Sequence, residues 1–595
     1  MSRRDRDALY WRLGQVVFLA ATAALAALAQ SSTKPIRNDG PLSLARKTDA
    51  IFAPYEQPNS PGCALGVIQN GSFLYKRGYG LGSVELQTAL TPKSVFYMGS
   101  ISKQFTAASA VLAAEEGYLS LDDDLRKWIP EIPFYGHTIT LRQMLHHTSG
   151  FRDEIGLMSL AGQHIEDIHS NAEVLDLIAR QKRLNFMPGE AYQYSNSNYV
   201  LLAEVIRRAT GRPLSVFAEE NIFQPLGMTH THFYDDRSVV LPGRVAAYAP
   251  RESGGFRVDW STNFEKVGDG GLMSSVDDLL LWDRNFYDNK LGKGTLVREL
   301  QTRGVLNSGK QIDYALGLFI TRHRGLPVVE HGGALFGYRT AVLRFPDQHF
   351  SVVCLCNLAS ANPEAEATQV ADLYLEGKSP QSPEPGSKPA TQNDDLSDAH
   401  GPVVADLRNW AGLYRDPKER TFIMVIPRDG GLEIRNPLVD PGSPNEAAQI
   451  LKQEGNGRFV DPRGPQYIFE SAANGRADLT IRSGNGSEHT LTRIHVVDPT
   501  TAELMSYAGN YVSEELATTY RLSSKNGRLL ITVGWNPPIE MQPGIAEEFR
   551  GRLNGEFREP IAIGFVRDHS LIVGFDLFAG SADGVREIRF VKSHP

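Results

Sequence analysis

The last third of the chain contains an internal repeat, and this repeat restricts what that part can fold into. Residues 410–414 (WAGLY) match residues 507–511 (YAGNY) at a separation of 97. A turn pair follows nineteen residues after the first aromatic residue of each copy, Asp429-Gly430 in one and Asn526-Gly527 in the other. Alternating apolar and polar residues flank both turns, which is typical of β-hairpins. We therefore expect two copies of one all-β module, each closed into an antiparallel barrel that leaves no sheet edge exposed.

Composition divides the rest of the chain. Its 595 residues are enough for three or four domains. The stretch 378–402 is rich in proline and almost free of large apolar residues, which indicates a disordered linker. This linker separates a mixed segment, 41–377, from the two expected barrels, 403–500 and 501–595.

The mixed segment combines strand and helix signals. Asn70-Gly71 between two apolar runs predicts a tight hairpin. Thr140 with Gln143 predicts a capping box at the start of a helix. The expected strands are 63–69, 73–78, 340–345 and 350–356, and the expected helices are 104–116, 141–146, 199–208 and 364–375. This order predicts an α/β domain with an antiparallel sheet flanked by helices and a helical subdomain inserted between the strands.

The first 29 residues have the pattern of a secretory leader. Arg3, Arg4, Arg6 and Arg12 precede an apolar stretch at 16–29 that ends in small residues. The stretch is shorter than the roughly 20 residues that span a bilayer, so an uncleaved anchor is the weaker alternative. We expect a signal peptide at 1–29 and a mature protein in a bacterial periplasm or outside the cell, without stable membrane insertion.

Charge and cysteine content exclude some classes of protein. The chain has 61 basic and 69 acidic residues, so it lacks the basic excess that binds nucleic acid. Its three cysteines cannot build a disulfide framework, and their odd number leaves at least one thiol unpaired. Because Cys63, Cys354 and Cys356 lie in apolar runs, we expect them to be buried as small hydrophobic residues. One bridge from Cys63 remains the open alternative.

The first signal of chemistry is Ser100 with Lys103 at the start of an alanine-rich helix. Side chains three residues apart share a face of a helix, so the lysine amine can polarise or deprotonate the serine hydroxyl. Ser31 and Lys34 have the same spacing, which arises by chance in a chain of this length. Taken alone, the pattern favours an ordinary capped helix.

Two more motifs change this interpretation. Tyr194 and Asn196 precede a helical run and offer a phenol that can relay a proton and an amide that can hold a substrate carbonyl. His331, Gly332 and Gly333 precede the strand-rich end of the segment, where small residues let a substrate backbone lie along a strand.

The three motifs Ser-x-x-Lys, Tyr-x-Asn and His-x-Gly, in this order, resemble those of the penicillin-recognising serine hydrolases related to class C β-lactamases. The similarity covers residues 41–377 and includes a His-Thr-Ser-Gly loop at 147–150. It implies a β-lactamase/transpeptidase-like fold for this segment.

The resemblance also implies roles for individual residues. Ser100 is the acylated nucleophile, and Lys103 and Tyr194 share the general base and acid work, with the first proton acceptor left open. Asn196 positions the amide on the acyl side of the substrate. The backbone N–H groups of Ser100 and Ala334 form the oxyanion hole.

One departure from the family pattern bears on the substrate. Relatives that cleave β-lactams commonly have lysine where this chain has His331, and threonine in place of Gly332. With Gly333 and two C-terminal barrels, this pattern resembles the D-aminopeptidase branch. We therefore expect a secreted serine hydrolase that acts on D-amino-acid-containing peptides or amides. The alternatives are a β-lactamase or an esterase of the same family, or a penicillin-binding sensor that is acylated without turnover.

We expect neither a cofactor nor a metal ion. The best local cluster, His230 and His232 with Asp235 and Asp236 nearby, is more simply a surface strand. The expected partner is a small peptide, amide or ester substrate, and the oligomeric state stays open. The barrels are either a partial cover of the catalytic cleft or docking modules.

Overall fold

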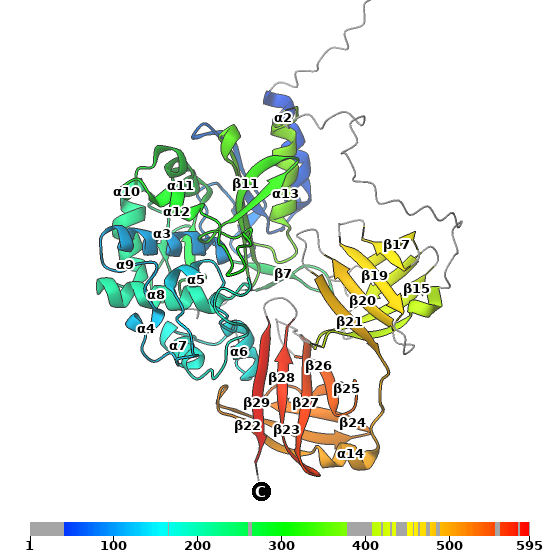
Figure 1. Cartoon of the computed structure of the whole chain (residues 1–595). Helices are drawn as coiled ribbons and strands as arrows, with labels where there is room; N and C mark the ends of the chain where they lie inside the picture. The colour runs from blue at the N-terminus through cyan, green and yellow to red at the C-terminus, as the bar shows by residue number, and fades with distance from the viewer. Residues whose placement is uncertain are drawn as a thin grey trace, which may run out of the picture. The chain divides into compact units, whose positions relative to one another are not determined.

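A computed structural model describes most of the chain from residue 41 onward (Figure 1). The described ranges are 41–164, 166–259, 265–377, 407–417, 420–428, 431–435, 449–455, 457–461, 465–471, 477–482, 488–553, 560–580 and 584–593. The expected leader and linker lie outside these residues. The chain divides into two compact units at Ala50, and the first unit contributes the beginning of helix α2 (Pro41–Phe52). No helix in the described ranges has the length and apolar character needed to cross a membrane.

The second unit begins with an antiparallel sheet of six strands in the order β10-β11-β12-β13-β1-β2. The bounds of these strands are β1 Cys63–Gln69, β2 Ser72–Tyr79, β10 Phe319–His323, β11 Leu326–Leu335, β12 Tyr338–Phe345 and β13 Phe350–Cys356. Asn70 and Gly71, with φ of 50° and 69°, form the turn between β1 and β2. The expected hairpin and antiparallel sheet are confirmed. The pairing of β1 with β13 joins the two ends of the domain.

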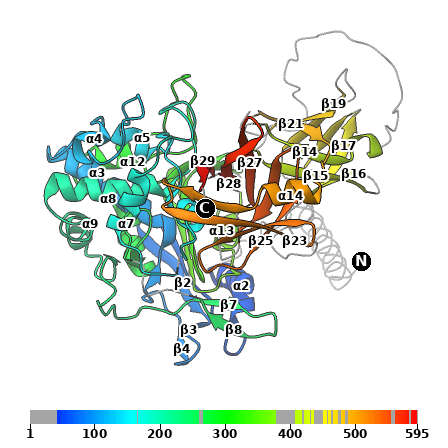
Figure 2. The same ribbon diagram turned by 90° about the horizontal axis from the view of Figure 1, so that it is seen from below.

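Short strands and helices form the segment between β2 and β10. The short strands are β3 Leu81–Ser83, β4 Thr88–Ala89, β5 Phe96–Tyr97, β6 His232–Phe233, β7 Tyr248–Pro250, β8 Phe256–Val258 and β9 Leu272–Ser274. The helices are α3 Ser102–Glu115, α4 Leu125–Trp128, α5 Leu141–Leu145, α6 Glu154–Leu160, α7 Asn171–Ala179, α8 Asn196–Thr210, α9 Leu214–Ala218, α10 Gln224–Leu226, α11 Val276–Asp288 and α12 Leu296–Leu300. Helices α3, α7, α8 and α9 lie together, as Figure 2 shows.

The central helix of this group is α3. All its residues from Ser102 to Ala113 are buried, because α8, α9 and α12 pack against it. Helix α13 (Pro363–Tyr374) packs on strands β12 and β13 with a second apolar core. The sheet is therefore covered by helices, as expected. The capping box of Thr140 and Gln143 at α5 is also confirmed.

The rest of the second unit holds two closed antiparallel barrels of eight strands each, as the repeat predicts. The first barrel consists of β14 Gly412–Arg415, β15 Phe422–Arg428, β16 Gly431–Arg435, β17 Gln449–Gly455, β18 Arg458–Val460, β19 Gln466–Ser471, β20 Ala477–Arg482 and β21 Glu488–Ile494. Helix α14 (Thr501–Ser506) precedes the second barrel. This barrel consists of β22 Gly509–Ser513, β23 Thr518–Lys525, β24 Arg528–Val533, β25 Ile539–Pro543, β26 Glu548–Arg552, β27 Pro560–Asp568, β28 Leu571–Ala579 and β29 Val585–Lys592.

The repeated sequence makes the same contact in both barrels. The Tyr414 hydroxyl donates to the carbonyl of Trp410 at 3.0 Å, and the Tyr511 hydroxyl donates to that of Tyr507 at 2.8 Å. Each tyrosine therefore ties the first strand of its barrel to the segment that leads into it. This shared contact gives the sequence repeat a structural meaning.

The cysteine expectation needs a correction. Cys63 and Cys356 are directly opposite each other on β1 and β13 and form a disulfide, and only Cys354 is a free, buried thiol. The expectation that all three are merely buried hydrophobic residues is wrong for two of them. The reason is the strand order, which places the two ends of the domain side by side.

Candidate active site

Ser100 lies in a short 3-10 turn (Gly99–Ile101) between β5 and helix α3. Gly99 has φ of +55°, and a Cβ at this position would lie 2.6 Å from the backbone nitrogen of Ala334. Only glycine therefore lets the turn approach strand β11 this closely. The turn places Ser100 at the start of α3, beside the end of β11 that contains Ala334.

Lys103 is completely buried and lies one helical turn beyond Ser100. Its amine lies 3.0 Å from the Ser100 hydroxyl oxygen, 2.7 Å from the Asn196 side-chain oxygen and 2.8 Å from the Asp269 backbone oxygen. Burial lowers the pKa of Lys103 to about 8, while the charge of Asp269 opposes this shift. A neutral amine donates two hydrogen bonds and has one lone pair. In that form the two carbonyl oxygens accept the two donated bonds and the lone pair is left for the Ser100 hydroxyl, whereas the protonated amine donates to the Ser100 oxygen as well.

Tyr194 packs between Lys103 and a histidine. The Lys103 amine lies 4.8 Å from the centre of the Tyr194 ring, and the rings of Tyr194 and His147 are 4.2 Å apart. The phenol oxygen of Tyr194 is buried and makes no well-aligned hydrogen bond among the described residues, although the Ser100 hydroxyl lies within its reach. Burial raises the pKa of Tyr194 well above its ordinary value. At neutral pH this phenol therefore holds its proton and is suited to donate it.

Asn196 connects the first two motifs directly. Its side-chain oxygen accepts from Lys103, and its side-chain nitrogen donates to Asp153 at 2.9 Å. Its backbone N–H donates to the same Asp153 oxygen at 2.6 Å. Both ends of the amide are thus engaged by the protein, so a substrate contact by Asn196 requires one of these bonds to be exchanged. Its expected role toward the substrate stays a prediction.

A buried charged cluster behind Lys103 was not foreseen from the sequence. The Lys266 amine lies 2.6 Å from a carboxylate oxygen of Glu154 and 2.6 Å from one of Asp269. Burial opposes the charge of Lys266, but the two carboxylates outweigh it and raise the pKa. The sequence gives no signal for this cluster, because Glu154 follows Arg152 and Asp153, and Lys266 follows Glu265, as charged residues do on a solvated surface. The cluster sets the electrostatic environment of Lys103.

The third motif lies at the end of β11. His331 is buried, and burial lowers its pKa to about 3, so the imidazole is uncharged at neutral pH. A Cβ at Gly332 would lie 1.9 Å from a Glu364 oxygen, and one at Gly333 would lie 2.1 Å from the Met98 oxygen. Backbone fills the space beside Gly333, so packing requires glycine there, whereas the neighbour of Gly332 is the end of a flexible side chain that can move. These contacts concern only the side-chain direction at the two glycines, so the expected substrate contacts of His331, Gly332 and Gly333 stay predictions.

The other histidine clusters have structural partners. His146 lies 3.1 Å from the Thr302 oxygen, and the His147 Nδ1 accepts from the backbone N–H of Ser195. His230 and His232 each face a different carboxylate. In the described part of the chain, the one group with ligand atoms close enough for a metal is Cys63, Cys354, Cys356 and Glu366. Two of these thiols are already joined in the disulfide.

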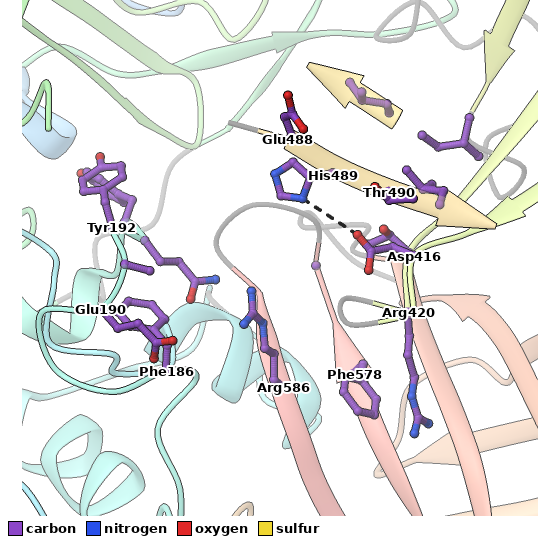
Figure 3. A pocket seen from close by; sticks show the side chains of 18 of the residues that line it. Phe186, Glu190, Tyr192, Asp416, Arg420, Glu488, His489, Thr490, Phe578 and Arg586 are labelled. Carbon is purple, nitrogen blue, oxygen red and sulfur yellow. Dashed lines mark ion pairs between the residues drawn. The ribbon is translucent and has the colours of Figure 1, made fainter. Parts of the chain in front are cut away.

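A cavity of about 1630 Å³ has Tyr194 in its lining, and Figure 3 shows many of the other residues around it. The catalytic domain lines it with Tyr192, Tyr194, Tyr314 and Phe319. Both barrels complete the wall: Asp416, Arg420 and His489 come from the first barrel, and Phe578 and Arg586 come from the second. Asp416 and His489 form an ion pair at 3.9 Å. The catalytic domain thus contributes a group of aromatic rings, and the barrels contribute a mixture of charged and apolar side chains.

The model of the beta-lactamase family matches residues 48–375. The chain belongs to this family. The expected membership of the penicillin-recognising serine hydrolases is thereby confirmed. Because the match includes all three motifs, it covers the residues grouped around Ser100.

Curated relatives agree with the family. D-aminopeptidase of Gluconobacter oxydans is 31% identical over 54% of this chain and 61% of its own length. Penicillin-binding protein 4* of Bacillus subtilis is 30% identical over 49% of this chain and 66% of its own length. D-aminopeptidase of Cereibacter sphaeroides (strain ATCC 17029) is 28% identical over 69% of this chain and 75% of its own length. The chain therefore matches less than two thirds of the length of the first two relatives.

A solved structure supports the fold. The octameric penicillin-binding protein homologue from Pyrococcus abyssi aligns with 75% of this chain and 99% of its own, with a TM-score of 0.53 and 21% sequence identity. This similarity concerns the fold alone.

Proposed function

We propose that this chain is a secreted serine hydrolase that cleaves amide bonds through an acyl-enzyme on Ser100. Its substrates are peptides or amides that contain D-amino acids. The observation that carries the proposal is the environment of Lys103, whose amine contacts Ser100 and Asn196 in a buried site. The names of the two D-aminopeptidase relatives support the substrate class.

The first half of the reaction acylates the serine. The neutral amine of Lys103 takes the proton of the Ser100 hydroxyl while the oxygen attacks the substrate carbonyl carbon. The N–H groups of Ser100 and Ala334 bind the oxyanion that forms. The Tyr194 phenol donates its proton to the leaving nitrogen, the carbon–nitrogen bond breaks, and the proton on Lys103 restores the phenol. The products of this half are a free amine and an ester between the acyl group and Ser100.

The second half hydrolyses this ester. A water molecule takes the place of the leaving amine and gives a proton to the same base while its oxygen attacks the ester carbon. The bond to Ser100 then breaks, and the proton returns to the serine oxygen. The acyl group leaves as a carboxylic acid, and the Ser100 hydroxyl and the neutral amine of Lys103 are restored. These steps need no cofactor.

The lining of the site supports amides and peptides over carboxylate-dependent β-lactams. His331 carries no charge at neutral pH, so it offers no cation for a substrate carboxylate. The nearby rings of Tyr192, Tyr314 and Phe319 favour an apolar or aromatic side chain on the substrate. The cavity is much larger than a single amino-acid amide, which suits short peptides as well.

A substrate panel tests the proposal. The purified protein is assayed with D- and L-alanyl and phenylalanyl amides, short-chain esters and a chromogenic cephalosporin. We expect the D-amides to be cleaved fastest. Ser100→Ala abolishes turnover, whereas Ser109→Ala on the same helix retains it. Cephalosporin turnover well above that of the amides contradicts the substrate class, and stoichiometric labelling of Ser100 without turnover selects a sensor instead.

The proposed location rests on the N-terminal sequence. A leader that is cleaved after residue 29 places the mature chain in the periplasm or outside the cell. Sequencing the N-terminus of the protein recovered from the periplasmic fraction tests this. Recovery of the full-length chain from the cytoplasm contradicts it.

A further inference from the structure

A buried ion pair joins the second barrel to the catalytic domain. Arg152 donates to a carboxylate oxygen of Glu515 at 2.6 Å, and the two side chains are only 1% and 5% exposed. Glu515 lies in the turn between β22 and β23. The same guanidinium donates to the side-chain oxygen of Gln181 at 2.9 Å and to the backbone oxygen of Arg586 at 2.6 Å. One side chain of the catalytic domain is thus held by two parts of the second barrel.

The next residue holds the catalytic centre. One oxygen of Asp153 accepts both N–H groups of Asn196, from the backbone and from the side chain. Its other oxygen caps helix α6 by accepting from Ile155 at 3.0 Å. The backbone oxygen of Arg152 accepts from Ser197 at 2.7 Å, so the start of α8 is tied to both residues. Asn196 in turn holds the Lys103 amine.

We propose that the second barrel completes the catalytic centre, with Glu515 and Arg152 as positioning residues that fix Asp153, and through it Asn196 and Lys103. This inference rests on the proposed function of Ser100 and Lys103. Arg152 is held at both ends, because its guanidinium binds the barrel and its backbone oxygen accepts from Ser197, so loosening Arg152 also loosens the peptide that leads to Asp153. The path from barrel to amine contains no gap: each step is a covalent bond or a hydrogen bond of 2.6 to 2.9 Å.

The chemistry of the pair supports a positioning role. Removing two charges from water has a large free-energy cost, and a buried pair often contributes little to stability for that reason. A guanidinium with acceptors on three segments does, however, fix the geometry of those segments, because its donors form a rigid fork. The neighbouring pair of Lys182 and Glu514 crosses the same interface but is exposed, so it offers a matched control.

The central experiment compares Glu515→Gln with Glu514→Gln in the full-length protein. We expect Glu515→Gln to lower kcat by about 10- to 100-fold, because misplacement of a catalytic group by about 1 Å has an effect of this size. Glu514→Gln stays close to the wild type. Tyr520→Phe serves as a second control, because it removes a hydrogen bond from the second barrel to Leu160, at the far end of α6 from Asp153.

The pH profile separates positioning from a loss of stability. The charged groups that face Lys103 are Asp269, Glu154 and Asp153, which raise its pKa, and Lys266, which lowers it. The other titratable groups beside it are His147, His331 and Tyr194, which are uncharged at neutral pH. When Asp153 moves away, the pKa of Lys103 falls and the acid limb of kcat/KM moves to lower pH. Loss of folded protein changes the amplitude of the profile and leaves this limb in place. Glu515→Asp retains the charge and is expected to recover part of kcat, and it carries the same test if Glu515→Gln does not fold.

Hydrogen exchange distinguishes failure of this inference from failure of the proposed function. In Glu515→Gln, the amides at 153–156 and 196–199 are expected to exchange faster, while Glu514→Gln leaves them unchanged. This readout stands even if the wild type hydrolyses none of the substrates. If Glu515→Gln matches Glu514→Gln in kcat, in its acid limb and in exchange, the barrel only docks and the inference is wrong.

Discussion

The Lys103 amine lies 2.7 Å from the side-chain oxygen of Asn196, which joins two motifs that are 93 residues apart in the chain. This contact, together with the bond to the Asp269 backbone oxygen, occupies two of the three directions around the nitrogen. The third direction faces the Ser100 hydroxyl oxygen at 3.0 Å. Lys103 is therefore arranged as a base toward Ser100, provided that its amine is neutral.

The pH dependence of the reaction follows from this requirement. Lys103 has a pKa of about 8, so its amine is mostly protonated below that pH and cannot take the serine proton. We expect kcat/KM to rise with pH to a plateau above about 8, because only the neutral amine is active. Tyr194 has a pKa well above its ordinary value, so it keeps its proton over this range. An ester without ionisable groups gives the cleanest measurement.

Asp269→Asn provides the companion measurement. The Asp269 charge raises the pKa of Lys103, so its removal is expected to move the acid limb to lower pH. An acid limb that stays in place, or moves to higher pH, shows that another group titrates there. Asp277→Asn, on the surface and away from the site, should leave the limb unchanged.

Ala334→Pro tests the expected oxyanion hole. Proline has no N–H, so this variant removes one of the two donors proposed to bind the oxyanion. Loss of one such donor lowers kcat by about 100-fold or more. Ala334→Gly retains the N–H and serves as the control for changes in β11. Full activity of a folded Ala334→Pro variant excludes this amide from the reaction.

Local patterns account for what the sequence predicts correctly. Ser100 and Lys103 are one helical turn apart, and the Asn70-Gly71 turn and the Thr140 capping box depend only on near neighbours. The repeat of the WAGLY segment likewise predicts two copies of one β module. Its tyrosine contacts a residue only four positions earlier in the chain. In each case the interacting groups lie within a few residues of one another.

Contacts between distant segments account for what the sequence does not predict. Glu154 and Lys266 are 112 residues apart, and Arg152 and Glu515 are 363 apart, so no periodicity or motif links them. Gly333 of the third motif lies against the backbone oxygen of Met98, a contact that no local pattern shows. Such pairings become visible only when the strand order and the docking of the barrels are known.

The disulfide gives a prediction that depends on this strand order. Thiol titration of the unfolded chain is expected to find one thiol without reductant and three after reduction. The bridge closes a loop of 293 residues, and the chain entropy of so long a loop corresponds to a stabilisation of about 6 kcal/mol. Cys63→Ala combined with Cys356→Ala should therefore lower the melting temperature strongly. Cys354→Ala, which removes only a buried thiol, should cost about 1 kcal/mol. Three free thiols without reductant contradict the bridge.

A second buried ion pair predicts an effect on stability without an effect on the reaction. Arg344 on β12 donates to Asp283 on α11 at 2.7 Å, and Ser351 on β13 donates to the same oxygen at 2.7 Å. Both charged side chains are almost completely buried. Asp283→Ala leaves the guanidinium without its counter-charge, so we expect the free energy of unfolding to fall by about 3 to 5 kcal/mol.

The control for this effect lies on the same helix. Lys76 and Asp277 form an exposed ion pair between β2 and α11, and such pairs contribute at most about 1 kcal/mol. Lys76→Ala should therefore change the urea midpoint only slightly. In Asp283→Leu combined with Arg344→Met, both charges are removed together, and much of the lost stability should return because no buried charge is left alone.

Since neither pair touches Ser100 or Lys103, kcat per folded molecule should equal that of the wild type in all three variants. A lower kcat in Asp283→Ala at a temperature where it is fully folded would show that α11 also positions the catalytic helix, through the bond from Trp282 to Gln104.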